Sequence, residues 1–203
     1  MTDPGHIASA AATLPSFTLD TNCMIDIDEN RPPAQHVRAL ADAHAAGQAT
    51  VAIGAIAASE RQRGGCLIAN FQEFRQRLAS LGLGHLEILT PMLYYDVCFW
   101  DHALWSSSEM EAVERRIHDT LFSNVEFLWP DYARAHGLDA NAAPAAWEWR
   151  NVKCDVQAIW AHIHHRRDVF VTSDMNYHKH SAKLIALGAG SIVTPEQAVT
   201  PLS

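Results

Sequence analysis

The sequence predicts an α/β fold in which helices cover both faces of a mainly parallel central sheet, giving three layers, α/β/α. Short apolar runs alternate with segments whose apolar residues recur every three or four positions, the spacing of an amphipathic helix. Strands and helices that alternate in this way are typical of parallel sheets. The chain has 203 residues, 48% of them hydrophobic and 19% charged, which suits a folded domain with a sizeable core.

Five short apolar runs are the expected strands, and the helical patterns lie between them. The strands are SFTLD at 16–20, TVAIGA at 50–55, LEILTP at 86–91, VFVTSD at 169–174 and SIVT at 191–194. The helices are expected at 21–28, 34–47, 66–82, 106–122, 152–165, 177–188 and 195–199. Residues 131–146 are expected to form a loop or a broken helix.

The pattern predicts one domain over residues 16–199, with a helical insertion around 92–149 where aromatic residues concentrate. Residues 1–15 are rich in alanine but have no basic start and no long apolar run, so we expect a short extension and not a signal peptide. No run approaches 18 apolar residues, so no membrane span is expected. The four cysteines are widely scattered, which favours a reducing, cytoplasmic setting over a disulfide framework.

The formal charge of −8 disfavours a broad basic surface for duplex nucleic acid. It leaves room for a small basic rim around a local site. Two alternatives stay open for four arginines: they guide an RNA backbone, or they belong to ordinary exposed helix faces. These are Arg61, Arg63, Arg75 and Arg77.

Four acidic residues are expected at one edge of the sheet. Asp20 and Asp174 each follow a strand, and Glu60 comes shortly after the second strand. Asp155 lies near the expected start of the helix before the fourth strand, where the same edge should be. Because ligands bind at the carboxyl ends of parallel strands, these side chains should meet there.

Carboxylates that gather at one point repel each other unless a cation lies between them. Oxygen ligands without cysteine suit Mg²⁺ or Mn²⁺. Two-metal carboxylate sites hydrolyse phosphodiesters by activating water and stabilising the leaving oxygen. The pattern therefore indicates a metal site for phosphodiester hydrolysis.

These motifs resemble the PIN domain, a nuclease family that includes toxin ribonucleases of bacterial toxin–antitoxin pairs and flap-type nucleases. The resemblance rests on FTLDTN, on Glu60 in VAIGAIAASER, on CDVQAIWAHI, and on VFVTSDMNY followed by GAGSIVTPEQA. It covers residues 16–61 and 151–199 and is poor between them. Asn176 stands where some relatives have a further acid, which puts the affinity of a second metal in doubt.

The resemblance implies a Mg²⁺- or Mn²⁺-dependent endonuclease that cuts single-stranded or structured RNA. Asp20, Glu60, Asp155 and Asp174 would hold the metals and carry the catalysis. Polar neighbours would orient substrate or ligands: Thr21, Asn22, Ser173 and Asn176. A protein inhibitor such as an antitoxin, or a second copy of the chain, is a further expected partner. The alternative is a PIN-like scaffold that binds nucleic acid or protein without cutting.

Three weaker patterns compete with this interpretation. MIDIDEN at 24–30 faintly resembles the Asp-x-Asp motif of haloacid-dehalogenase-like phosphatases. HIHHRRD at 162–168 has zinc-like histidine spacing, although solvent-exposed residues at a helix end are the simpler interpretation. The tryptophans and tyrosines favour a core or a dimer surface over base stacking. Cys154 is expected to be a small buried residue and not a nucleophile.

Overall fold

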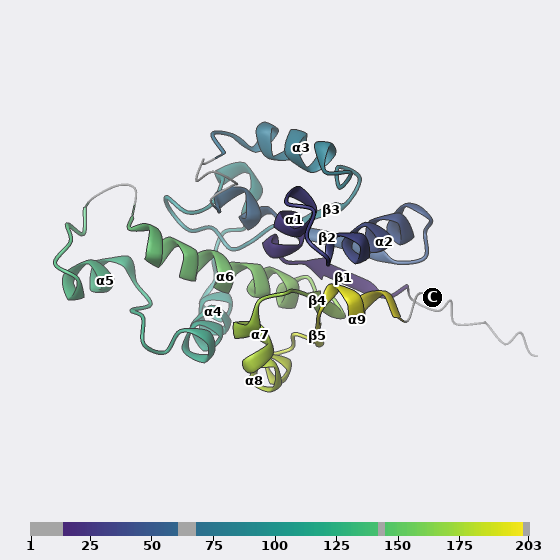
Figure 1. The fold of residues 1–203 in the computed structure, drawn as a ribbon. Helices are drawn as coiled ribbons and strands as arrows, with labels where there is room; N and C mark the ends of the chain where they lie inside the picture. Colours follow the sequence, from purple (N-terminus) through teal and green to yellow (C-terminus); the bar gives the residue numbers. More distant parts are fainter. Residues whose placement is uncertain (1–13, 61–67, 142–144, 201–203) are drawn as a thin grey trace, which may run out of the picture.

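In the computed structural model, which describes residues 14–60, 68–141 and 145–200, five parallel strands form one sheet. The order across the sheet is β3-β2-β1-β4-β5 (Figure 1). The chain winds from β1 towards β3 on one side and returns to β4 on the other, so the order reverses at the β1–β4 pair. The strands are β1 Ser16–Leu19, β2 Thr50–Gly54, β3 Glu87–Leu89, β4 Val169–Val171 and β5 Ser191–Val193.

Helices connect the strands throughout the described part of the chain. The α-helices are α1 Thr21–Asp28, α2 Ala34–Ala45, α3 Phe71–Ser80, α4 Ser108–Leu121, α5 Trp129–Ala135, α6 Trp147–His164, α7 Met175–Lys179, α8 Ser181–Ala186 and α9 Pro195–Val199. Two short 3-10 helices are η1 Ala55–Ser59 and η3 Trp100–His102.

Alternation along the strands divides the buried side chains between two cores. Phe17, Leu19 and Val171 point to one face, where they pack with residues of α1, α2, α3 and α9. Phe170 points to the other face, where it packs with residues of α4, α6, α7 and α8. Successive strand residues point to opposite faces, so the parallel strands are covered on both sides, as expected for this α/β class.

Several expected elements differ from the structure at their ends. The helix expected at 152–165 begins at Trp147. The helix expected at 177–188 is two short helices that meet at His180. The one expected at 66–82 begins at Phe71, and residues 66 and 67 lie outside the described residues.

The middle segment, 92–149, contains α4 and α5 and leads into α6. It is not a separate body, because Ile117 and Leu121 of α4 are part of the second core together with Ile159 and Trp160 of α6. Figure 1 shows α5 at the end of the molecule remote from the sheet. In the described residues, no helix combines the length and apolar character that a membrane span requires.

Two of the competing patterns are contradicted by their surroundings. MIDID lies inside α1, so Asp26 and Asp28 do not follow a strand as the phosphatase motif requires. His162 is fully buried and not solvent-exposed. Its ring nitrogens lie 2.9 Å from Thr18 Oγ1 and 2.8 Å from the Ala189 carbonyl oxygen. His162 therefore joins α6 to β1 and is not placed as a zinc ligand.

Candidate active site at the carboxyl ends of β1 and β4

The described structure has a cleft of about 290 Å³ where the strand order reverses. Folds of this kind bind ligands in the crevice outside the carboxyl ends of the strands at that point. Eight residues line the cleft: Asp20, Thr21, Asn22, Glu60, Trp147, Asn151, Asp155 and Asp174. The four acids expected from the sequence are all among them.

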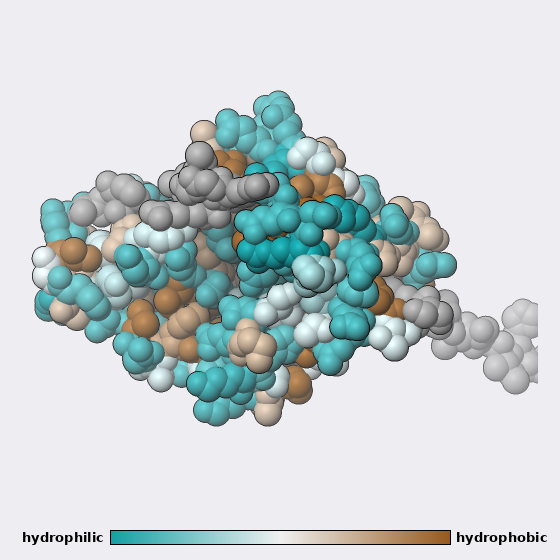
Figure 2. All heavy atoms as spheres, in the orientation of Figure 1, coloured by the Kyte–Doolittle hydropathy of each residue, from teal (hydrophilic) through white to brown (hydrophobic). Residues whose placement is uncertain are grey.

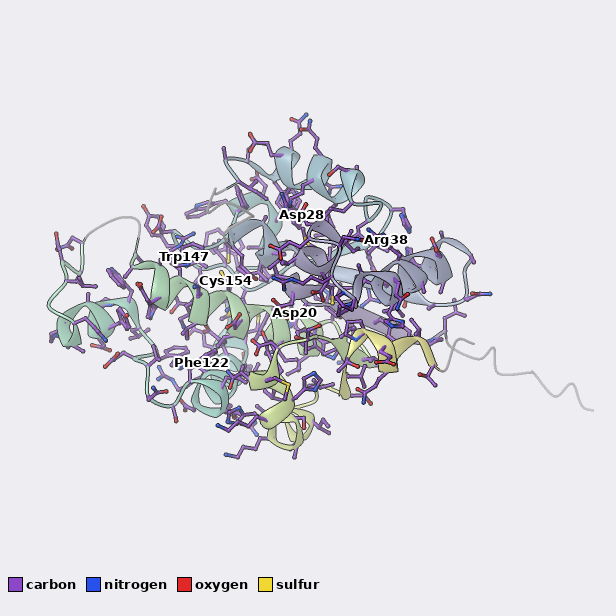
Figure 3. All side chains as sticks on the ribbon, in the orientation of Figure 1. Asp20, Asp28, Arg38, Phe122, Trp147 and Cys154 are labelled. Atoms are coloured by element: carbon purple, nitrogen blue, oxygen red, sulfur yellow. The ribbon has the colours of Figure 1, made fainter. Side chains whose placement is uncertain are left out.

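Asp20 follows β1 and is the N-cap residue of α1 (Figure 3). Its carboxylate accepts hydrogen bonds from the Thr21 backbone N–H at 2.8 Å, from Asn22 Nδ2 at 3.1 Å and from the Thr172 hydroxyl at 2.7 Å. Burial nevertheless raises its pKa to about 6, with a further contribution from the charge of Asp174. The three donors thus fix the orientation of Asp20 without cancelling the cost of burying its charge.

Glu60 comes directly after η1, which the chain enters from β2. The Thr21 hydroxyl donates to its Oε1 at 2.6 Å, so α1 holds both Asp20 and Glu60 in place. Burial raises the pKa of Glu60 to about 8, and the nearby Asp20 charge acts in the same direction. Glu60 is therefore mostly protonated at neutral pH in the absence of a cation.

Asp155 lines the cleft, but for a different reason from the one expected. It lies midway along the 18-residue helix α6 and not at its start. The part of α6 that precedes Asp155 is about 12 Å long. It runs along the cleft, so Trp147 and Asn151 line the cleft as well. Burial and then the charges of Glu60, Asp20 and Asp174 raise the pKa of Asp155 well above its usual range.

Trp147 and Asn151 were not among the residues expected at the site. They precede Asp155 by eight and four positions, and residues four apart lie on one face of a helix. This spacing would have identified both, had the helix been predicted to start five residues earlier. Asn151 is exposed and Trp147 is half-buried, so both can reach a ligand in the cleft.

Asp174 is the N-cap residue of α7 and accepts a hydrogen bond from the Asn176 backbone N–H at 2.8 Å. Two expected substrate contacts near it lie elsewhere. Ser173 is outside the cleft, and its hydroxyl donates to Asp26 at 3.2 Å. The Asn176 side-chain amide lies 3.5 Å from the Leu121 carbonyl oxygen and does not line the cleft. Thr172, which was not singled out, contacts Asp20 instead.

The cleft is strongly polar and acidic, and Figure 2 shows hydrophilic residues gathered over the region of α1. Its acids raise one another's pKa values, so a bound cation would be favourable at this position. Within the described ranges, however, no three histidine, cysteine, aspartate or glutamate side chains are arranged to hold one metal ion. The carboxylates share the cleft without converging on a single point.

The other residues considered from the sequence are placed as follows. Arg77 forms an ion pair with Asp28 at 3.0 Å, which links α3 to α1, and Arg75 lies over the Phe71 ring of its own helix at 5.6 Å. Arg61 and Arg63 lie outside the described residues. Cys154 is fully buried beside Asp155, and burial raises the pKa of its thiol well above the usual range. The prediction that Cys154 is buried is confirmed.

The fold and the cleft define a class: an α/β protein with a parallel sheet and an acidic cleft where the strand order reverses. Comparison with protein-family models, with curated proteins and with solved structures finds no match to this chain.

Proposed function

We propose that this chain is a divalent-metal-dependent nuclease of the PIN type that hydrolyses phosphodiester bonds in RNA. One observation carries the proposal: four carboxylates from distant parts of the sequence line one cleft at the β1–β4 edge of the sheet. The preference for RNA and the PIN assignment rest on the sequence resemblance. The three cysteines within the described residues, Cys23, Cys98 and Cys154, are free and buried, which suits a reducing setting such as the cytoplasm.

The residues present fit Mg²⁺ or Mn²⁺ by their chemistry. The acids of the cleft are oxygen ligands, which these ions prefer, and burial and mutual repulsion raise the pKa values of three of them. Asp20, Glu60, Asp155 and Asp174 would supply its ligands, and in the described geometry they line the cleft without meeting at one point. When bound, it would supply Lewis-acid stabilisation of the phosphate and a lower pKa for water.

The chain's own polar groups position the acids. Thr172 and Asn22 both donate to Oδ2 of Asp20, and Thr21 donates to Glu60. These bonds reduce the motion of the carboxylates before substrate arrives, which lowers the cost of organising the site. Of the other residues that line the cleft, the exposed Asn151 would donate its amide to a phosphate or sugar oxygen, and the half-buried Trp147 would offer a ring surface for a base.

The test is cleavage of single-stranded RNA, structured RNA and DNA in Mg²⁺, Mn²⁺ or EDTA. We expect metal-dependent cleavage that Asp20→Asn and Asp155→Asn each reduce at least about a hundredfold. Asp42→Asn is the matched control, because Asp42 is exposed in the last turn of α2, towards the opposite edge of the sheet. Equal cleavage by Asp20→Asn, Asp155→Asn and Asp42→Asn would refute the proposal.

A second candidate is a scaffold of the same fold that binds nucleic acid or a protein without cutting. The absence of three ready metal-holding side chains among the described residues favours it. Titration calorimetry with Mn²⁺ separates the two candidates. The nuclease should bind Mn²⁺ and lose that binding in Asp155→Asn, whereas the scaffold should show no binding that depends on Asp155.

A further inference from the structure

A second pocket, of about 200 Å³, is formed in the described structure by residues that include chain neighbours of the acidic cleft. Its polar residues are Ser59, Asp96 and Arg150, and its apolar walls include Ala58, Val97 and Phe99. Two of these are chain neighbours of cleft residues. Ser59 precedes Glu60 and Arg150 precedes Asn151, so their Cα atoms are only about 3.8 Å from those of the neighbouring cleft residues. The two hollows are therefore lined by neighbouring residues at two points of the chain, Ser59–Glu60 and Arg150–Asn151.

The pocket contains two buried polar atoms that have no hydrogen-bond partner. They are the hydroxyl oxygen of Ser59 and Nε of Arg150, and the two residues are only 5% and 8% exposed. Buried polar groups are nearly always paired in native proteins, because an unpaired one keeps its full desolvation cost. Two such groups in one small pocket indicate a ligand that pairs with them.

The third polar residue, Asp96, restricts the chemistry of that ligand. Its Oδ2 accepts from the Ala145 backbone N–H at 3.0 Å and lies 3.4 Å from Arg150 Nη1. The pocket thus presents a cation and an anion together. A phosphate would meet Arg150 favourably but would be repelled by Asp96. A neutral ligand with a donor and an acceptor side by side would satisfy both.

We propose that this pocket binds one unpaired nucleobase of the RNA, next to the bond that is cut in the acidic cleft. The inference rests on the proposed nuclease function and adds a basis for substrate selection to it. A base edge presents adjacent donors and acceptors to Arg150, Asp96 and Ser59, and its flat faces match the apolar walls. The pocket is smaller than the roughly 300–1,000 Å³ of drug-sized sites, which limits it to a single ring system.

The test uses Ser59→Ala in the Asp20→Asn protein, whose cleavage is reduced, with EDTA present. The substitution removes an unpaired buried hydroxyl, so it should leave folding intact or improve it. Its matched control is Ser191→Ala, an exposed serine at the start of β5 and therefore at the opposite edge of the sheet. Binding is measured by fluorescence anisotropy with fluorescein-labelled single-stranded RNA, and then with the same RNA carrying one abasic nucleotide at each position in turn.

We expect Ser59→Ala to weaken RNA binding about threefold to tenfold, the effect of one neutral hydrogen bond, and Ser191→Ala to have no effect. One abasic position should weaken binding by the parent protein, and Ser59→Ala should add nothing further with that RNA, because the two changes remove the same contact.

Two results would overturn the pocket while leaving the nuclease intact. One is an unchanged affinity in Ser59→Ala for an RNA that the wild-type protein cleaves. The other is a Ser59→Ala effect that persists at every abasic position, which would mean a backbone or phosphate contact. If the wild-type protein neither cleaves nor binds any RNA, the proposed function and the pocket both fail.

Discussion

The Asp20 side chain has two roles: it caps helix α1 and it lines the acidic cleft. As the N-cap residue of α1 it accepts a backbone N–H of the helix, and it also takes donors from Asn22 and Thr172. Its oxygen atoms face the cleft that Glu60, Asp155 and Asp174 share. Burying these acids together has an energetic cost, which appears as pKa values of about 6 for Asp20 and about 8 for Glu60.

This cost predicts how stability depends on pH in metal-free protein. The pKa of Glu60 is about 8 in the fold against an ordinary value of 4.5. Between these values the folded state keeps a proton that the unfolded state has released, so stability falls as pH rises through this window and levels off above it. Below pH 4.5 both states are protonated and the penalty is absent.

Glu60→Gln should therefore stabilise the protein at high pH. We expect its free energy of unfolding in EDTA to exceed that of wild type by on the order of 2 kcal/mol at pH 8.5, and to equal it at pH 4. Urea denaturation at the two pH values measures this, with the exposed Glu196→Gln as control. A Glu60→Gln protein no more stable than wild type at pH 8.5 would show that Glu60 ionises without penalty.

The positions of the site residues could be predicted from the sequence only in part. Asp20, Glu60, Asp155 and Asp174 reach the cleft because strand ends and chain connections fix them. The sequence does not show which side chains of the segment after β4 point into the cleft. Thr172 and Asp174 point towards the cleft and Ser173 points the other way to Asp26, since neighbours in an extended segment face opposite sides.

At the scale of elements, α6 connects the site to the second core. Its start was misplaced because Ala146, the residue before it, makes no side-chain cap that the sequence could have shown. Further along, Lys153 of α6 is fully buried and donates to Glu114 of α4 at 2.9 Å. Gln157 donates to the same Glu114 oxygen at 3.1 Å. This polar cluster fixes α4 against α6 within the second core.

Removing one partner of the buried Lys153–Glu114 ion pair should destabilise the fold. Lys153→Met leaves Glu114 buried without its counter-charge, and we expect a loss of about 3–5 kcal/mol in the free energy of unfolding. The double variant Glu114→Gln, Lys153→Met removes both charges and should recover most of the loss. Urea denaturation compares them with Lys183→Met, whose lysine is exposed on α8. If the double variant is as unstable as Lys153→Met, packing and not charge accounts for the effect.

At the scale of the whole molecule, the alternating pattern predicts the fold class but not the order of the five strands across the sheet. The apolar runs predict a parallel sheet with two covered faces, which the two cores confirm. They do not say which strands are neighbours, because that depends on how each connection packs across the sheet. The placement of β4 beside β1 is the step that brings Asp174 to Asp20.

The middle segment adds an exposed aromatic row to this frame. Tyr95, Trp100 and Trp105 are 75%, 58% and 78% exposed. The Trp100 ring contacts the other two edge-on, with ring centroids 6.3 and 6.2 Å away. The sequence favoured a core or a dimer surface for such residues, and Trp149 and Trp160 are indeed buried. The exposed row begins beside Asp96 and Phe99, in the chain segment that forms one wall of the base pocket.

We expect this row to stack unpaired bases that continue from the pocket. Trp100→Ala with Trp105→Ala should weaken binding of single-stranded RNA to the Asp20→Asn protein at least about tenfold, since stacking on aromatic rings contributes about 1–3 kcal/mol per base. The melting temperature should hardly change, because both rings are exposed. Fluorescence anisotropy measures the first effect, with Ile185→Ala as an exposed apolar control on α8.

A second copy of the chain is the other occupant that an exposed aromatic row suits, and sedimentation velocity separates the two. If wild-type protein is a dimer that the Trp100→Ala, Trp105→Ala variant dissociates, while RNA affinity per chain is unchanged, the row is a subunit interface and the stacking prediction is wrong. If the protein is a monomer with or without the tryptophans and only RNA binding is lost, the single strand runs from the acidic cleft past the base pocket and along the row.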